Sequence, residues 1–156
     1  MKKVISALSL LLVSTVIFAQ TAATSAPHVQ KKAEDFIKFK ESSHNFGKIK
    51  HGVPVTYDFY FTNTSDQPIV IEYASASCGC TTPTWPQGAI AKGKTDKITA
   101  GFNAGSVAPF NKTITVKLAG IDIPVVLTIT GEVLSAEEYV KYEASKGKSA
   151  SKPGSK

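Results

Sequence analysis

Residues 55–62 read VTYDFYFT, and this stretch decides the fold class. Val55, Tyr57, Phe59 and Phe61 alternate with Thr56, Asp58, Tyr60 and Thr62. A period of two residues is typical of a β-strand that buries one face and exposes the other. The stretch therefore predicts a half-buried strand whose four larger apolar side chains face a core.

Similar patterns on both sides of this stretch predict further short strands. They fall at about residues 36–40, 46–49, 69–77, 98–102, 114–118 and 125–133. Segments rich in Asn, Asp, Gly and Pro separate them, and residues 83–88 form a proline-containing loop. About seven short strands in one chain predict an all-β fold, an immunoglobulin-like antiparallel β-sandwich. A small barrel is the alternative.

The N-terminal region differs from this body. Residues 1–19 have the basic, apolar and small-residue order of a secretory signal peptide, with cleavage after Ala19. The apolar run is shorter than the roughly 20 residues that span a bilayer, and no later stretch is apolar enough to do so. Residues 20–34 form a polar linker, and residues 35–134 form a single sandwich domain. We therefore expect an exported, periplasmic or secreted protein without a transmembrane segment in its mature chain.

Residues 135–156 follow the predicted domain and contain two kinds of sequence. Ser135 and Glu138 have the spacing of a capping box, which predicts a short helix to about Ala144. The remainder is rich in Lys, Ser and Gly, a composition typical of a disordered tail.

The charge of the chain is unevenly distributed. The formal net charge is +6, yet the body from Glu34 to Leu134 holds nine lysines and nine acidic residues. All eighteen basic residues are lysine, so the chain lacks the arginine fork that best recognises phosphates and guanine. A neutral body and the absence of arginine argue against nucleic acid as a partner.

Cys78-Gly79-Cys80 is the main candidate site. In an extended strand, side chains two residues apart point to the same face, with Cα atoms near the upper limit for a disulfide. Gly79 can adopt the backbone angles that bring the two sulfurs together, at the cost of strain. A bond that closes so short a loop adds little stability and is easier to reduce than an ordinary structural disulfide.

Three interpretations of the cysteine pair remain open. The first is a pair of structural thiols or a local disulfide formed after export, which we favour because exported proteins oxidise readily. The second is a thiol-disulfide exchange site, which needs a cation near the thiolate, and only Lys92 and Lys94 are suggested for it. The third is a copper or zinc site. His28, His44 and His51 are available as further ligands, but their positions favour none of them, so we expect no cofactor.

Trp85 is the other residue that suggests binding. It is the single tryptophan and lies between two prolines, so it is either a stacking platform for a ligand or a lid over the cysteines, and we favour the lid. Asn63 and Asn111 begin glycosylation sequons, but such short motifs arise by chance. Searches for known catalytic motifs find none.

Several short motifs are shared with one known family. They are Phe46-Gly47, Phe61-Thr62-Asn63-Thr64, Ser77-Cys78-Gly79-Cys80-Thr81-Thr82-Pro83, Gly93 and Asn111-Lys112-Thr113-Ile114. In these motifs, over about residues 35–133, the chain resembles a bacterial exported family known as domain of unknown function 1573. The resemblance implies an immunoglobulin-like sandwich in the bacterial envelope or outside the cell, and it implies no activity. Two departures are Trp85, where such proteins often have tyrosine, and the lysine-rich tail.

These observations favour a non-enzymatic binding or scaffolding module of the cell envelope, with a protein or glycan partner. The alternative is a copper-binding or thiol-redox protein that acts through Cys78 and Cys80.

Overall fold

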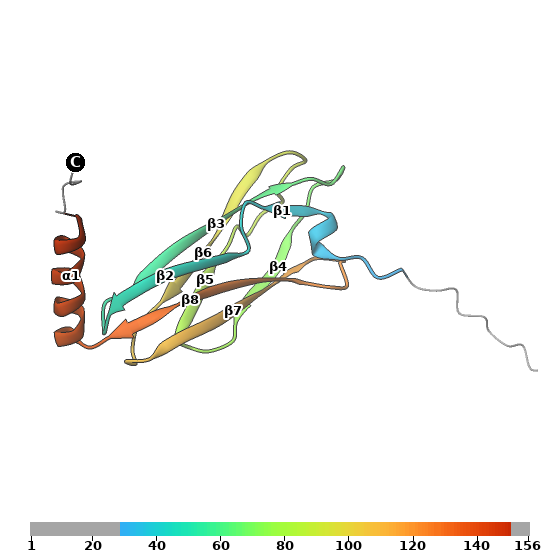
Figure 1. Cartoon of the computed structure of the whole chain (residues 1–156). Coiled ribbons are helices and arrows are strands. Elements are labelled where there is room, and N and C mark those ends of the chain that lie inside the picture. Colours follow the sequence, from blue (N-terminus) through green and yellow to red (C-terminus); the bar gives the residue numbers. More distant parts are fainter. Residues whose placement is uncertain (1–28, 151–156) are drawn as a thin grey trace, which may run out of the picture.

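The computed structural model describes residues 29–150, which form a sandwich of two four-stranded sheets followed by one helix (Figure 1). In chain order the elements are η1 (Ala33–Asp35), β1 (Ile37–Phe39), β2 (Ser43–Lys50), β3 (Val55–Asn63), β4 (Ile71–Ala76), β5 (Thr81–Thr84), β6 (Thr95–Phe102), β7 (Pro109–Leu118), β8 (Val125–Leu134) and α1 (Ala136–Ala150). The predicted signal peptide, most of the predicted linker and residues 151–156 lie outside the described residues. The predicted all-β, immunoglobulin-like sandwich is confirmed.

The strand order is β1-β3-β6-β5 in one sheet and β2-β8-β7-β4 in the other. The long pairs β3/β6 and β7/β8 are antiparallel, as predicted. One pair departs from the predicted antiparallel arrangement, because β2 runs parallel to β8. The chain leaves the first sheet after Phe39 and enters the second at Ser43, so β2 keeps the direction of β1 and lies beside a strand that runs the same way.

The structure has eight strands where about seven were expected, because β5 lies partly in the predicted proline loop. Thr81, Thr82 and Thr84 favour extended backbone, since branching at Cβ suits a strand. Pro83 is tolerated because β5 is an edge strand, where a missing N–H need not break a ladder.

The core fills the space between the two sheets. Phe59 and Phe61 of β3 are fully buried, while Val55 and Tyr57 at the other end of the same face are only partly buried. Across from them, the second sheet contributes buried side chains at alternate positions of β7 and β8. These are Phe110, Ile114, Val116, Leu118, Val125, Leu127, Ile129 and Val133. The alternation predicted from the sequence therefore places the core correctly.

The helix α1 stands at one end of the sandwich, beyond the last residue of β8 (Figure 1). Its predicted capping box is confirmed, because Ser135 Oγ and N both contact Glu138 Oε2 (2.7 and 3.0 Å) and Glu138 N donates to Ser135 Oγ (3.3 Å). These contacts hold the pKa of Glu138 below its ordinary value, chiefly through the side-chain hydrogen bond to Ser135. The helix continues past the predicted end near Ala144 into the start of the lysine-rich segment. Among the described residues, no helix is long and apolar enough to cross a membrane.

Candidate functional site

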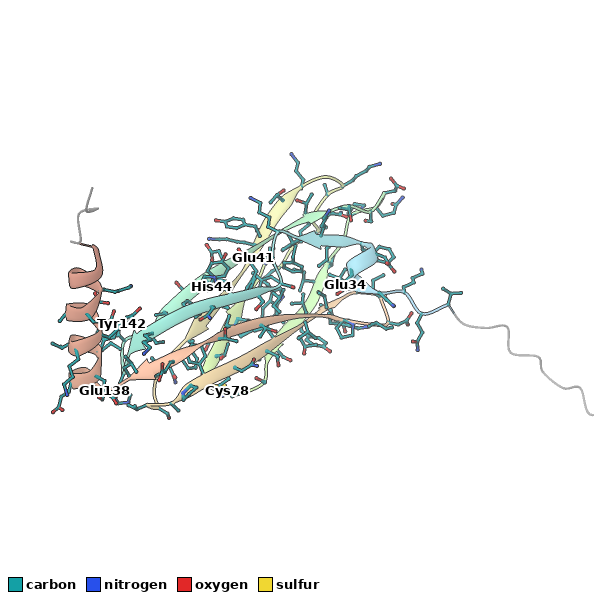
Figure 2. All side chains as sticks on the ribbon, in the orientation of Figure 1. Glu34, Glu41, His44, Cys78, Glu138 and Tyr142 are labelled. Carbon is teal, nitrogen blue, oxygen red and sulfur yellow. A yellow bond between two sulfur atoms is a disulfide. The ribbon has the colours of Figure 1, made fainter. Side chains whose placement is uncertain are left out.

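The two cysteines form a disulfide where the chain crosses from one sheet to the other. Cys78 and Cys80 lie between the end of β4 and the start of β5, with Cα atoms 5.3 Å apart. The segment is a turn and not the extended strand end that was expected, which explains why this separation falls below the upper limit for a disulfide. Figure 2 shows Cys78 toward the end of the sandwich that carries α1. Both cysteines are half-buried and Gly79 is exposed.

Three loops meet at this end of the sandwich, and we call residues 51–54, 77–80 and 103–108 together the disulfide end. Backbone hydrogen bonds tie them to one another. Gly52 N donates to Ala104 O (2.9 Å), and Asn103 N donates to Cys80 O (3.1 Å). The loops are therefore held in a fixed arrangement by the scaffold, as binding loops usually are.

Two hollows flank the disulfide. One, of about 130 Å³, lies between β6, β7 and Cys80, and its walls include the stacked rings of Phe102 and Phe110, whose centroids are 4.1 Å apart. The other, of about 220 Å³, lies between residues 54–56, Gly79 and Cys80. Cys80 borders both hollows, and it also packs against the hydrophobic core.

Thr81 contributes a buried hydroxyl beside the disulfide. Its Oγ1 lies 3.7 Å from Cys78 Sγ and 4.0 Å from Cys80 Sγ, and the residue is only 4% exposed. No other hydrogen-bond partner for this hydroxyl occurs among residues 29–150. A disulfide sulfur is a weak acceptor, so this hydroxyl is only loosely satisfied.

Lys112 is a cation that lines the smaller hollow together with Cys80, and it was not the lysine suggested by the sequence. It shares the smaller hollow with Cys80, whereas Lys92 bonds Asp66 and Lys94 N bonds Ala91 O in a distant turn. A signal for Lys112 is present in the sequence, because the alternation of Ile114, Val116 and Leu118 places residue 112 on the same face when it is extended backward.

Exposed valines and a strained residue also mark the disulfide end. Val53 is 48% exposed and Val107 is 50% exposed, and they belong to the two loops that the Gly52–Ala104 hydrogen bond joins. Ala104 between them is fully buried with φ of 52°. This left-handed conformation costs a non-glycine residue roughly 1–2 kcal/mol and is common at functional loops.

His44 and His51, two of the histidines suggested as further ligands, make other contacts in the structure. His44 stacks on the ring of Tyr57 (centroids 3.5 Å apart), and the Tyr57 hydroxyl donates to Glu41. That hydrogen bond raises the pKa of Tyr57 above its ordinary value. His51 Nε2 lies 3.3 Å from Gly105 O, and His28 is outside the described residues. In the described part of the chain, no group of three or more His, Cys, Asp or Glu could hold a metal ion.

Trp85 does not cover the disulfide, so the predicted lid is wrong. It follows β5 while Cys80 precedes it, which places their Cα atoms about 16 Å apart at a rise of about 3.3 Å per residue. Trp85 is half-buried against the core beside a shallow hollow shared with Asp96, Lys97 and Thr99. Its Nε1 is buried and has no partner among the described residues. Its role as a binding residue stays a prediction.

Comparison with solved structures finds the same sandwich fold in several proteins of low sequence identity. The PapD-like domain 7 of human CEP192 matches with a TM-score of 0.57 and 9% identity, over 65% of this chain and 87% of that one. A protein of unknown function from Porphyromonas gingivalis W83 matches with a TM-score of 0.53 and 9% identity, over 62% of this chain and 46% of that one. The secreted serine protease VesC from Vibrio cholerae matches with a TM-score of 0.51 and 13% identity, over 70% of this chain and 26% of its own. At these identities the similarity shows a shared PapD-like sandwich and nothing about activity.

Comparison with curated proteins finds no match. A family model described as "Protein of unknown function (DUF1573)" matches residues 37–133. That range runs from the first residue of β1 almost to the end of β8, so it includes both sheets and the disulfide. The chain therefore belongs to the DUF1573 family of proteins of unknown function.

Proposed function

We propose that this chain is a non-enzymatic binding module of the bacterial cell envelope, and that a protein partner contacts its disulfide end. Export is the expectation that residues 1–19 carry. The observation that supports the binding surface is the pair of half-exposed valines, Val53 and Val107, on loops joined by a backbone hydrogen bond. Exposed apolar side chains on rigid loops are typical of sites that meet another protein.

The edges of both sheets are poorly suited to pairing with a strand of a partner. β1 has three residues, and β5 has four and includes Pro83. The other two edge strands, β2 and β4, each contain an irregularity, at Phe46–Gly47 and at Glu72. Short strands, prolines and bulges are the devices that stop a further strand from pairing with a sheet edge. The loops of the disulfide end are therefore the better surface for a partner.

A protein partner fits this surface better than a glycan. The exposed apolar side chains of the disulfide end are Val53 and Val107, while the aromatic rings beside it, Phe102 and Phe110, are buried. Trp85, the best stacking platform in the chain, lies at the other end of β5 and is half-buried. Protein interfaces have an apolar centre with a polar rim, and Asn103, Ser106 and Lys112 supply polar groups around the smaller hollow.

Site-specific photo-crosslinking tests this proposal. A photoreactive amino acid is placed at Val53, Val107 or Val126 in cells that express the full chain. Val126 is the matched control, because it is 48% exposed but lies on the outer face of β8. We expect one protein adduct of the same mass at positions 53 and 107 and none at 126. Adducts only at 126, or equal adducts at all three positions, would refute the proposed surface.

Charge substitutions give the second arm of the test. Val53→Asp and Val107→Asp are expected to abolish the adduct formed from the other loop, because a carboxylate is costly to bury in an apolar interface. Val126→Asp is expected to leave it intact. Thermal unfolding of each variant shows whether the domain is folded.

The alternative function, copper binding or thiol redox chemistry, predicts a different outcome for Cys78→Ser/Cys80→Ser. A binding module keeps its partner adduct in this variant as long as the loops stay folded. Metal analysis of the purified wild-type chain tests copper and zinc directly, and a stoichiometric content of either metal would favour the alternative.

A further inference from the structure

We infer that the Cys78–Cys80 disulfide oxidises dithiols by thiol-disulfide exchange, with the Thr81 hydroxyl stabilising the thiolate that is released. This stoichiometric exchange is the thiol chemistry named above as part of the alternative function, and it is compatible with binding of a protein partner because it uses the disulfide and not the exposed valines. It rests on three features of the disulfide end, which are the access to Cys80, the isolated hydroxyl of Thr81 and the position of Lys112.

Access determines which sulfur is attacked. Cys80 borders both hollows beside the disulfide, whereas Cys78 borders neither of them. Because Cys80 also packs against the core, an incoming thiolate has to approach it through one of these hollows. In the proposed exchange the thiolate attacks the Sγ of Cys80 by this path, and Cys78 becomes the leaving group.

Thr81 is placed to receive that leaving group. Its hydroxyl lies nearer to Cys78 Sγ (3.7 Å) than to Cys80 Sγ (4.0 Å), and these sulfurs are its only partners within the described residues. A thiolate is a much stronger acceptor than a disulfide sulfur, because hydrogen bonds to an ionised group are shorter and stronger. Reduction therefore converts a poorly satisfied buried hydroxyl into the donor of a charge-assisted hydrogen bond.

The stronger hydrogen bond from Thr81 in the reduced state favours reduction of the disulfide over its re-formation. An interaction that stabilises only the reduced form makes a disulfide a better oxidant. The ammonium of Lys112, which shares the smaller hollow with Cys80, acts in the same direction because a nearby cation favours the thiolate. The hollow also brings this charge close to an incoming thiolate.

The exchange takes place in two steps. A thiolate of the dithiol attacks Cys80 Sγ, which forms a mixed disulfide and releases Cys78 as a thiolate. The second thiol of the substrate, after losing its proton, attacks the substrate sulfur of the mixed disulfide and releases Cys80. The substrate dithiol has then lost two electrons and two protons, and the chain has gained both as the Cys78 and Cys80 dithiol. Each chain performs one such oxidation, and no other reactant is required.

Equilibration of the purified full chain in glutathione redox buffers tests the role of Thr81. The reduced and oxidised forms are quantified by alkylation and intact mass in the wild type, Thr81→Val, Thr81→Ser and Thr82→Val. Valine has nearly the same shape as threonine without the hydroxyl, serine keeps the hydroxyl, and Thr82 is the exposed neighbour. We expect the ratio of reduced to oxidised chain to fall about tenfold in Thr81→Val, as expected for one hydrogen bond to a charged group. Thr81→Ser and Thr82→Val should stay within about threefold of the wild type.

A titration of the reduced chain separates this role from a structural one. Thiolate absorbance near 240 nm is followed against pH. We expect the first thiol of the wild type to titrate below the ordinary cysteine pKa of about 8.5, with a rise in that pKa in Thr81→Val and not in Thr82→Val. An unshifted wild-type thiol would overturn the inference, as would equal reduction equilibria in Thr81→Val and Thr82→Val. The assay contains no partner protein, so its result is independent of the crosslinking experiment.

Trapping of the mixed disulfide tests the order of attack. The oxidised wild-type chain is exposed briefly to reduced glutathione, quenched with acid and alkylated, and peptide mapping is expected to find glutathione on Cys80 and the alkyl group on Cys78. The opposite order would overturn the assignment of Cys80 as the attacked sulfur.

Discussion

The loops at the two ends of the sandwich are held together by different kinds of interaction. At the end formed by residues 63–68 and 90–94, which we call the Asn63 end, one buried side chain joins the loops. Asn63 Nδ2 donates to Gln67 O (2.9 Å) and Ile90 O (2.8 Å), and its Oδ1 accepts from Ser65 N (2.9 Å) and Oγ (2.7 Å). Asn63 is fully buried with every polar atom of its side chain bonded.

The disulfide end is held by a covalent bond and by backbone contacts, and its side chains are less satisfied. The Thr81 hydroxyl has only sulfur partners among the described residues, Ala104 is strained, and Val53 and Val107 are half-exposed. A fully hydrogen-bonded network such as that of Asn63 stabilises a single structure. Backbone strain and exposed apolar groups, as at the disulfide end, are features of functional sites. The Asn63 end therefore has the features of a stabilising network, and the disulfide end has the features expected of the binding surface proposed above.

The network of Asn63 also excludes a modification. Asn63-Thr64-Ser65 matches a glycosylation sequon, but a glycan would replace one of the two hydrogens that Nδ2 donates, and the side chain is fully buried. The sequon is explained by the turn that it builds.

The largest effect is expected for Asn63→Ala. The substitution removes four side-chain hydrogen bonds, each worth about 1 kcal/mol net, and it leaves the amide of Ser65 without its side-chain partner. We expect the free energy of unfolding to fall by about 3 kcal/mol, measured by urea denaturation. Thr64→Ala is the control at an exposed neighbour. A loss below about 1 kcal/mol would contradict the view that this network stabilises the Asn63 end.

A smaller loss is expected for Cys78→Ser/Cys80→Ser. The disulfide closes a loop of three residues, and the chain-entropy model assigns so short a loop about 1.5 kcal/mol. Urea denaturation of the variant and of the wild type under non-reducing conditions measures this difference. A loss larger than that of Asn63→Ala would reverse the comparison and make the disulfide the main structural element of the two.

Trp85→Phe tests the one exception at the Asn63 end. Trp85 lies toward this end after β5, and its buried Nε1 lacks a partner within the described residues. Phenylalanine loses some apolar contact but removes the unsatisfied donor, whose burial costs about 1–3 kcal/mol. We expect the stability to change by less than about 1 kcal/mol. A loss above about 2 kcal/mol would mean that Nε1 makes a stabilising hydrogen bond.

The sequence predicted the fold far better than the site, for physical reasons that differ between elements. Residues 55–62 and the β7/β8 hairpin follow local alternation, and the capping box of Ser135 and Glu138 is local as well. The parallel pairing of β2 with β8 depends on contacts between Ser43 and Thr128 or Ile49 and Val133, which are distant in the sequence. No local pattern contains that information.

The cysteine pair was identified from the sequence, but its surroundings were not. Thr81 lies two residues before Pro83 in a segment that resembled a loop, so the sequence did not predict its burial in β5. Lys112 continues the alternation of Ile114, Val116 and Leu118 backward by one step, but a lysine does not itself indicate a position that faces inward. Trp85 was expected over the disulfide because residues 83–88 were expected to form a loop. Residues 81–84 instead form the strand β5, which carries the chain away from the cysteines.

The smallest effect is expected on lowering the pH, and it should appear at only one end of the molecule. Glu138 has a pKa below its ordinary value of 4.5 in the folded chain, so its ionised form stabilises α1 at pH values above 4.5. That stabilisation is lost as the pH falls through the folded pKa, when the carboxylate that accepts from Ser135 becomes protonated. Lys48 and Lys141 are the nearby cations that also favour the ionised form.

Amide hydrogen exchange at acidic pH measures this local effect. We expect faster exchange at Tyr139 N, which donates to Ser135 O (2.9 Å) at the start of α1, after correction for the intrinsic pH dependence. Glu138→Gln should remove the pH dependence and expose the same amide at neutral pH. Protection of Asn63 N, which donates to Lys94 O, should not change in this range, because the side-chain network around it consists of an amide, a hydroxyl and carbonyls that do not titrate. Equal loss of protection at both amides would show that acid loosens the whole sandwich, and the two ends would then not be independent.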